Sequence, residues 1–435
     1  MTFGAQNGNL SRRVVCALDP AAQPGVAWSV RNGRFWAWAA AGAAILGICI
    51  ATLHSRGAGS TTSGWSFYLT TGDAAFAELI ANLILFIPLG VALTIAGVRP
   101  LRVIAAGAVL SCTVEFLQQW IPGRDPSLGD IVANTNSTAL GVLLVVAAPI
   151  WLLAPSRRST WQALITAIIA VLVWSGTAFM LRQTAPPLPY DVVLTPDFRY
   201  FGHYNGRVID VRPAKTGGRL DITAIAATEP PSQTSPLIAI LDKRGAKVLM
   251  LSVDHADLTL RYHMPALDAT LDQPDLRLRG ALRGIAPGDT FTAATWHDST
   301  DICLQLNSVQ RCGLGYTIGD GWKLIYNPQS WPPWALALIN TLWMAGCVIG
   351  VGFWGLRGDS AAIRRIAIAI AILGSLIVPL ATHLNATTLY EFLGVLGGIV
   401  AGRRLARLTL KGQLDTPGPS AARYTAPPAH PLQTS

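Results

Sequence analysis

The sequence predicts a polytopic α-helical membrane protein of about eight transmembrane helices with one inserted antiparallel β-sandwich domain. The chain of 435 residues is 51% hydrophobic and only 13% charged, whereas a soluble protein has roughly 25% charged residues. Eight apolar runs are each close to the roughly 20 residues that span a bilayer. Between the fifth and sixth runs, residues 190–330 change to short alternating apolar and polar runs, which is typical of β-strands.

The N-terminal half begins with a mixed, polar segment, residues 1–33, which we expect to be a flexible cytoplasmic tail. Five apolar runs follow and predict a five-helix membrane domain over residues 34–182, at about 35–53, 76–97, 102–120, 129–153 and 161–181. The first run has no clear cleavage site after it, so we expect it to be retained as a helix. Pro88 in the second run is acceptable because neighbouring helices can bond the groups that it frees.

Residues 183–333 are expected to form the β-sandwich. Turn residues separate the short apolar runs, which are RLDITAIAA, PLIAILD, KVLMLSV, LTLRYHM, LRLRGAL, TFTAATW, ICLQL and WKLIYN. About 140 residues suffice to bury a core. Cys303 and Cys312 flank a short run, and an oxidising compartment would let them form a disulfide.

Three further apolar runs, at about 334–356, 363–382 and 388–402, predict a three-helix membrane region over residues 334–411. The last run is short and rich in glycine. Residues 412–435 are mostly Pro, Ala, Ser and Thr without periodicity, so we expect a disordered cytoplasmic tail.

Basic residues indicate the topology. Alternate loops and the two tails contain 16 basic residues, whereas the opposite short loops contain three, Arg56, Arg124 and Arg182. The positive-inside rule therefore predicts a multi-pass protein of the cytoplasmic (inner) membrane with both termini in the cytoplasm and the β domain outside. Because the basic residues lie in short loops and not on a soluble face, no nucleic-acid partner is expected.

Polar residues that are costly inside a membrane occur around the third and fourth helices. Under the predicted topology they converge near the outer leaflet as candidate ligand-binding residues: Asn82, Glu115, Gln119, Arg124, Asp130 and Asn134. Arg124 suits a phosphate, and Glu115 or Asp130 suits sugar hydroxyls or the role of a base. The alternative is structural, with Glu115 paired to Arg124, Asp130 in a capping box with Ser127, and the amides bridging helices.

Three segments together resemble the VanZ-like membrane family: NLILFIPLG (82–90), EFLQQWIPGR (115–124) and DIVANTNSTALG (130–141). The resemblance implies a cell-envelope role, since the family is named for a protein linked to resistance to the glycopeptide teicoplanin. The chain departs from the family at Asn136–Ser137, where a glycine is usual, so close helix packing is not expected there.

A second segment repeats this pattern weakly. TLYEFLGVLGGIVAG (388–402) aligns with SLGDIVANTNSTALG (127–141), placing Glu391 at Asp130 and Gly402 at Gly141. We expect Glu391 to join the candidate ligand-binding residues. Chance similarity between glycine-rich membrane helices is the alternative.

The β segment is similar to concanavalin-like or laminin-G-like sandwiches in GRVIDV, ILDKRG and CLQLNSVQRC. This similarity implies a glycan as a partner. The scattered histidines and the cysteine spacing indicate no metal site, and we expect no cofactor.

The expected function is binding, at the outer leaflet, of a membrane lipid, a lipid-linked envelope precursor or a glycan. Two alternatives stay open. One is a membrane enzyme acting on a polyprenyl-phosphate-linked substrate, with Glu115 and Asp130 as weak catalytic candidates. The other is a transporter of lipid or lipid-linked sugar.

Overall fold

The computed structural model describes residues 24–53, 74–121, 124, 126–184, 189–198, 201–213, 219–298, 301–328 and 331–414. The chain divides into two compact units. The first consists of Met1–Ala154, Thr177–Trp331 and Thr382–Asn385, and the second of Pro155–Gly176, Pro332–Ala381 and Ala386–Ser435. The described residues contain seven helices that are long and apolar enough to cross a membrane.

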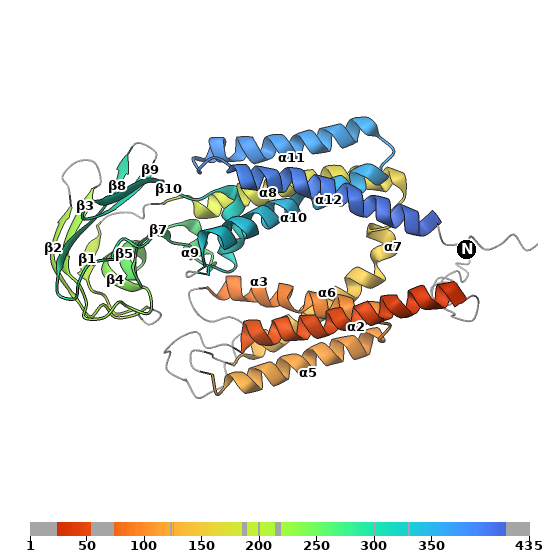
Figure 1. Cartoon of the computed structure of the whole chain (residues 1–435), viewed down its shortest axis with the longest axis horizontal. Helices are drawn as coiled ribbons and strands as arrows, with labels where there is room; N and C mark the ends of the chain where they lie inside the picture. The colour runs from red at the N-terminus through yellow and green to blue at the C-terminus, as the bar shows by residue number, and fades with distance from the viewer. Residues whose placement is uncertain are drawn as a thin grey trace, which may run out of the picture. The chain divides into compact units, whose positions relative to one another are not determined.

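The helical part of the first unit runs from α2 to α7 (Figure 1): α2 (Pro24–Thr52), α3 (Ala75–Leu85), α4 (Ile87–Ile95), α5 (Pro100–Gln118), α6 (Leu128–Val146) and the short α7 (Ala148–Trp151). Helix α2 begins inside the segment expected to be a tail. The bundle core contains Phe86, Leu89, Val103 and Val114. Most of the other helix surface is apolar and exposed, as expected for a bundle in lipid.

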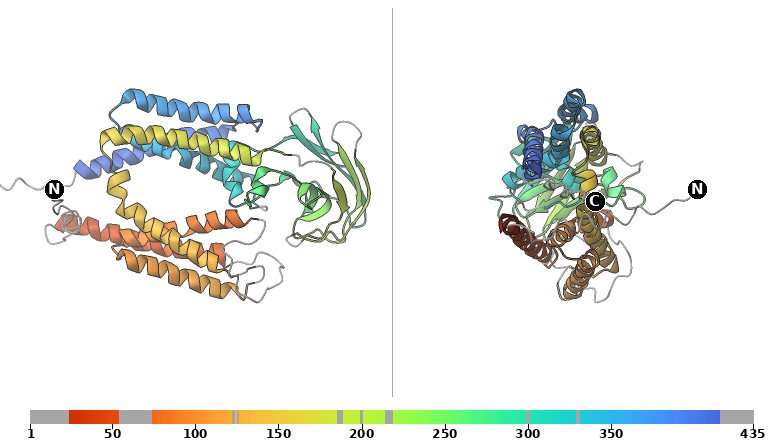
Figure 2. Two further views of the ribbon diagram at one scale, coloured as in Figure 1. Left: turned by 180° about the vertical axis from the view of Figure 1, so that it is seen from behind. Right: turned by 90° about the vertical axis from the view of Figure 1, so that its right-hand side faces the viewer.

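The second unit contains most of α8 (Ser156–Leu181), together with α10 (Pro333–Arg357), α11 (Ala361–Thr382) and α12 (Leu389–Leu414). The fifth expected span is thus placed mainly with the C-terminal helices. The eighth expected span, 388–402, is helical but is not among the seven, since α12 continues into a basic stretch that begins at Arg403. Helices α10 and α12 lie side by side (Figures 1 and 2).

The β domain is a sandwich of two antiparallel five-stranded sheets, as the alternating pattern predicts. One sheet has the order β1-β4-β5-β6-β7: β1 (Asp191–Leu194), β4 (Ser235–Leu241), β5 (Lys247–Asp254), β6 (Asp257–Tyr262) and β7 (Leu276–Leu278). The other has the order β10-β9-β8-β3-β2: β2 (Arg207–Pro213), β3 (Leu220–Ile225), β8 (Thr290–Asp298), β9 (Asp301–Leu306) and β10 (Val309–Leu314). The short helix α9 (Pro265–Asp268) follows β6. Leu237, Leu251, Leu258 and Leu304 are fully buried between the sheets.

A disulfide joins Cys303 of β9 to Cys312 of β10, with 4.0 Å between their Cα atoms. It cross-links the neighbouring strands at the end of the second sheet. The bond is in keeping with folding in an oxidising compartment, which is where the predicted topology places the domain.

The run WKLIYN, expected to be a strand, is not one. Its first residues belong to a 3₁₀ helix, η1 (Ile318–Leu324). Asp320 accepts hydrogen bonds from the backbone N–H of Thr317 and from its hydroxyl, forming a capping box that fixes the helical turn. The alternating apolar pattern predicted a strand here, and the prediction was wrong because the local capping hydrogen bonds favour a helical turn.

Arg277 organises a buried ionic network in the β domain. Its side chain is 10% exposed and pairs with Asp254, with Asp275 at 2.8 Å and with Asp257 at 3.3 Å. Burial by itself raises the pKa of Asp254, but Arg277 and His255 outweigh burial and hold that pKa below its ordinary value. The network therefore stabilises the fold only while Asp254 is ionised.

Candidate functional site

The expected polar residues of the bundle gather around the C-terminal half of α3, the end of α5 and the beginning of α6. Asn82 of α3 donates from Nδ2 to Oδ1 of Asp130 on α6 at 2.6 Å. This bond joins two parallel helices that are separated in the chain by α4 and α5. Both side chains are half-buried, so the pair is accessible from one side.

Glu115 of α5 is 2% exposed and completes the cap of α6. Its Oε2 accepts a hydrogen bond from the backbone N–H of Ser127 at 2.9 Å, while the Ser127 hydroxyl accepts from the N–H of Gly129 at 3.0 Å. Ser127 is therefore the N-cap, as expected, but Glu115 and not Asp130 bonds its N–H. The charges of Asp130 and Arg124 both act on the Glu115 carboxylate.

One helical turn deeper, Ser111 of α5 meets Asn134 of α6. Asn134 Nδ2 donates to Ser111 Oγ at 3.0 Å, and the two side chains are 2% and 0% exposed respectively. Asn134 Oδ1 is buried and has no hydrogen-bond partner within the described protein. We call Ser111, Glu115, Asp130 and Asn134 the polar seam, since four-residue spacing aligns each pair along its helix.

Below the seam, glycines let the helices approach closely. A Cβ on Gly107 would lie 2.2 Å from the Thr138 hydroxyl oxygen. A Cβ on Gly141 would lie 2.5 Å from the backbone oxygen of Ile87. Backbone atoms at Gly141 and a short, buried threonine side chain at Gly107 cannot move aside cheaply, so these contacts favour glycine.

Ser137 repairs the helix break that Pro88 creates between α3 and α4. Its hydroxyl donates to the backbone oxygen of Leu83 at 2.7 Å and accepts from the N–H of Phe86 at 3.1 Å. A neighbouring helix thus bonds groups at the break, as expected for a proline in a membrane helix. Close packing occurs at Ser137, although the sequence departs there from the family pattern.

Arg124 and the glutamines lie at the end of α2. Arg124 Nη2 donates to the backbone oxygen of Ala51 at 2.9 Å, and Gln118 Nε2 donates to that of Thr52 at 3.0 Å. Both side chains satisfy carbonyl groups that the helix end leaves free. Gln119 is half-buried, and its side chain makes no hydrogen bond within the described residues. Gln118, which we had not selected, is the glutamine that contacts the bundle.

Glu391 lies in the second unit, where it repeats the bond between Asn82 and Asp130. It is fully buried, and its two oxygens accept from Asn340 Nδ2 at 2.9 Å and from the N–H of Thr388 at 2.9 Å. Asn340 is on α10 and Glu391 on α12, so an amide again bonds an acid across parallel helices. A Cβ on Gly402 would lie 2.0 Å from the backbone oxygen of Ile349, so the aligned glycine also lies at a close helix contact.

Sequence reasoning missed Ser111, Ser137 and Asn340. A usable signal existed for two of them. Ser111 precedes Glu115 by one turn, and Asn340 lies in an apolar helix where an amide needs a partner. Ser137 was noticed only as a departure from a family glycine.

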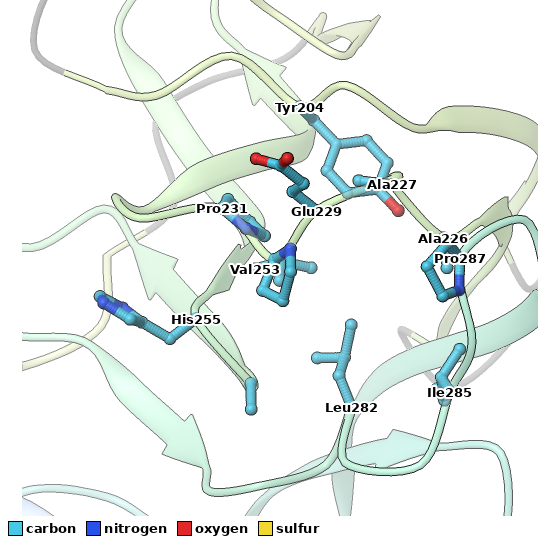
Figure 3. Close-up of a pocket in the computed structure, with 12 residues that line it drawn as sticks. Tyr204, Ala226, Ala227, Glu229, Pro231, Val253, His255, Leu282, Ile285 and Pro287 are labelled. Atoms are coloured by element: carbon cyan, nitrogen blue, oxygen red, sulfur yellow. The ribbon is translucent and has the colours of Figure 1, made fainter.

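The β domain has a small cavity of about 100 Å³ (Figure 3). Leu282 and Ile285 form one wall and Tyr204 the opposite wall, while the His255 ring points away. Glu229 lies at its rim, and the Tyr204 hydroxyl donates to the backbone oxygen of Ile225 at 2.8 Å. In the described parts of the chain, no group of three His, Cys, Asp or Glu residues could hold a metal ion.

Comparison with known proteins identifies the helical segment. Residues 40–152 match the family model described as VanZ/LLP1. The match covers α3 to α7 and the polar seam, and it extends the expected resemblance into the C-terminal part of α2. No curated protein and no solved structure matches the chain.

Proposed function

We propose that this cell-envelope membrane protein, whose residues 40–152 match the VanZ/LLP1 family model, binds a lipid-linked ligand at its polar seam. The observation that carries the proposal is the buried Asn134 Oδ1, which has no partner in the described protein. A buried acceptor without a donor costs about 1–3 kcal/mol. A ligand that donates a hydrogen bond would remove this cost.

The chemistry of the seam favours a ligand rich in hydroxyl or amide N–H groups. Glu115 and Asp130 contribute carboxylate oxygens, and Asn134 contributes an amide oxygen, so acceptors predominate. Sugar hydroxyls and peptide amides are the complementary donors. Because the seam lies on membrane-spanning helices, a lipid-linked sugar or peptide precursor satisfies both the polar and the apolar surroundings.

A phosphate of such a ligand is assigned to Arg124. Its guanidinium bonds the backbone oxygen of Ala51 at the end of α2, and a planar guanidinium is the side-chain group that matches phosphate oxygens in geometry and charge. Arg124 follows Glu115 by nine residues, in the connection between α5 and α6, so it lies near the end of the bundle that carries the seam. Arg124 would thus link the α2 end to a ligand in the seam.

A glycan is proposed as the partner of the β domain. The cavity beside Tyr204 has apolar walls and a carboxylate, Glu229, at the rim. Apolar walls suit the C–H face of a sugar, and a carboxylate accepts hydroxyl donors. Envelope binding of this kind would connect the chain to glycopeptide susceptibility, which the family resemblance implies.

The test compares Asn134→Leu with Thr135→Ala in the full chain. Thr135 is the matched control on the same helix, because its hydroxyl bonds only its own turn, at Ile131, within the described residues. Native mass spectrometry of protein purified from its own membranes should detect a retained lipid-linked species in the wild type and in Thr135→Ala. Asn134→Leu should lose that species.

Thermal unfolding makes the result specific. Asn134→Leu removes an unpaired buried acceptor but also the hydrogen bond to Ser111, and because these two effects oppose each other its unfolding temperature should stay close to that of the wild type. Loss of the ligand with stability intact would support a binding role. Retention of the same ligand by Asn134→Leu would refute the proposal, and so would the absence of any retained ligand in the wild type.

A further inference from the structure

Two adjacent arginines at the start of α8 lack an acidic partner. Arg157 and Arg158 are exposed, and neither forms an ion pair or hydrogen bond within the described residues. The first turn of α8 contains no acidic residue. The start of α8 therefore presents two guanidinium groups on consecutive residues whose positive charge no described acid neutralises.

These arginines line an open groove of about 500 Å³, whose other lining residues are Pro155, Trp161, Gln162 and Ile165. The size is within the range of sites for small ligands. Trp161 and Ile165 are 52% and 51% exposed, so they form an apolar surface directly beside the charge. The groove thus combines a cationic end with an apolar wall.

The apolar wall continues along the helix. Ile165, Ile169 and Leu172 are exposed large side chains at spacings of four and three residues, so they follow Trp161 along one side of α8. The stripe from Trp161 to Leu172 is about 16 Å long, which is about half of the hydrocarbon thickness of a bilayer, and it begins beside the arginine pair. An elongated apolar chain would lie along it.

The α10–α11 loop is bonded to the start of α8 through its acidic residue. Thr160 donates from Oγ1 to Asp359 Oδ1 at 2.6 Å and accepts from the Asp359 N–H at 2.9 Å, which fixes the α10–α11 loop to α8. Asp359, the one acidic residue of that loop, is thereby engaged. Arg364 follows it and packs beside Gly355, where an added Cβ would lie 3.3 Å from its side chain.

We propose that this groove binds an anionic phospholipid, with its phosphate on Arg157 and Arg158 and an acyl chain along Trp161, Ile165 and Leu172. Guanidinium groups bind phosphate oxygens in pairs. The arginine-rich loops indicate the cytoplasmic leaflet by the positive-inside rule, and this leaflet carries anionic lipid. The site is independent of the polar seam, because all its residues belong to the second unit.

The experiment titrates phosphatidylglycerol and phosphatidylcholine onto the delipidated full chain in a neutral detergent, followed by native mass spectrometry. Arg157→Gln/Arg158→Gln should weaken binding of the first phosphatidylglycerol on the order of thirty-fold, since each basic residue near an anionic surface contributes about fivefold. The matched control, Arg404→Gln/Arg407→Gln, removes the same charge from two exposed arginines of α12. It should weaken binding by less than about threefold.

Three results would overturn the proposal. Equal weakening by the two double variants would mean diffuse charge and no built site. Equal affinity of the wild type for phosphatidylcholine would remove the role of the anionic headgroup. If a phosphatidylglycerol with six-carbon acyl chains bound as tightly as one with long chains, only the phosphate site would remain, and the acyl-chain contact along Trp161, Ile165 and Leu172 would be excluded. Size-exclusion profiles that match the wild type establish that each variant is folded.

Discussion

The hydrogen bond between Asn82 and Asp130 should measurably couple α3 to α6. It is short, at 2.6 Å, and involves a carboxylate. Hydrogen bonds to charged groups contribute about 1.5–3 kcal/mol in soluble proteins, but pairs inside a membrane average about 0.6 and reach about 1.7 kcal/mol. Since both side chains are only half-buried, we expect a coupling free energy of about 1 kcal/mol.

The assay is a double-mutant cycle on the full chain in bicelles, with the free energy of unfolding measured for Asn82→Ala, Asp130→Ala and the double variant. The exchanged variant, Asn82→Asp/Asp130→Asn, keeps one amide and one acid with their positions reversed. It should recover at least half of the coupling. Thr135→Ala, which removes only a hydroxyl bonded within its own helix, should change stability by less than about 0.5 kcal/mol.

A coupling near zero, or an exchanged variant no more stable than the single variants, would refute the idea that this bond holds the helices. The exchanged variant also separates structure from ligand binding. If it is stable but retains no ligand, then the carboxylate is needed at position 130 and not merely somewhere in the pair.

Three further predictions concern other parts of the chain. Cys303→Ser/Cys312→Ser should destabilise the β domain by about 2–3 kcal/mol, the amount expected for a loop of this length, and limited proteolysis of the full chain against temperature would measure it. Asp254 has a lowered pKa, so its contribution is complete above about pH 5 and is lost as the pH falls through the lowered value. Asp254→Asn should flatten the dependence of β-domain stability on acid pH, and an unchanged acid profile would disprove this. Glu391→Leu should lower the free energy of unfolding by about 1–3 kcal/mol for each of the two N–H donors that it leaves unpaired. Glu391→Gln should lower it by less than about 1 kcal/mol, and denaturant unfolding would measure both variants. Equal losses in the two variants would contradict the role of Glu391 as a hydrogen-bond acceptor.

Periodicity and composition predicted most of the fold. Apolar runs of bilayer length located the membrane helices, and alternation located seven strands of the sandwich. The strand expected at WKLIYN failed because Thr317 and Asp320 cap a helical turn there. A local hydrogen bond of this kind competes with a pattern that only reports which side chains are apolar.

The candidate site could be predicted only in outline. Topology placed Asn82 and Asp130 at a common depth, and the structure joins them directly. The topology prediction could not show that Glu115 accepts a hydrogen bond from the Ser127 N–H, or that Arg124 donates to the backbone oxygen of Ala51. Such partners depend on the rotation and approach of separate helices, which one sequence does not specify.

The hydroxyl of Ser137 spans the gap at Pro88 and so couples the junction of α3 and α4 to α6. A proline usually gives a helix a hinge that bends on its own. Here bending would strain the two hydrogen bonds that the Ser137 hydroxyl makes with Leu83 and Phe86. We therefore expect α3 and α6 to tilt together. A displacement of α3 would thereby also displace α6, which carries Asp130 and Asn134 of the polar seam.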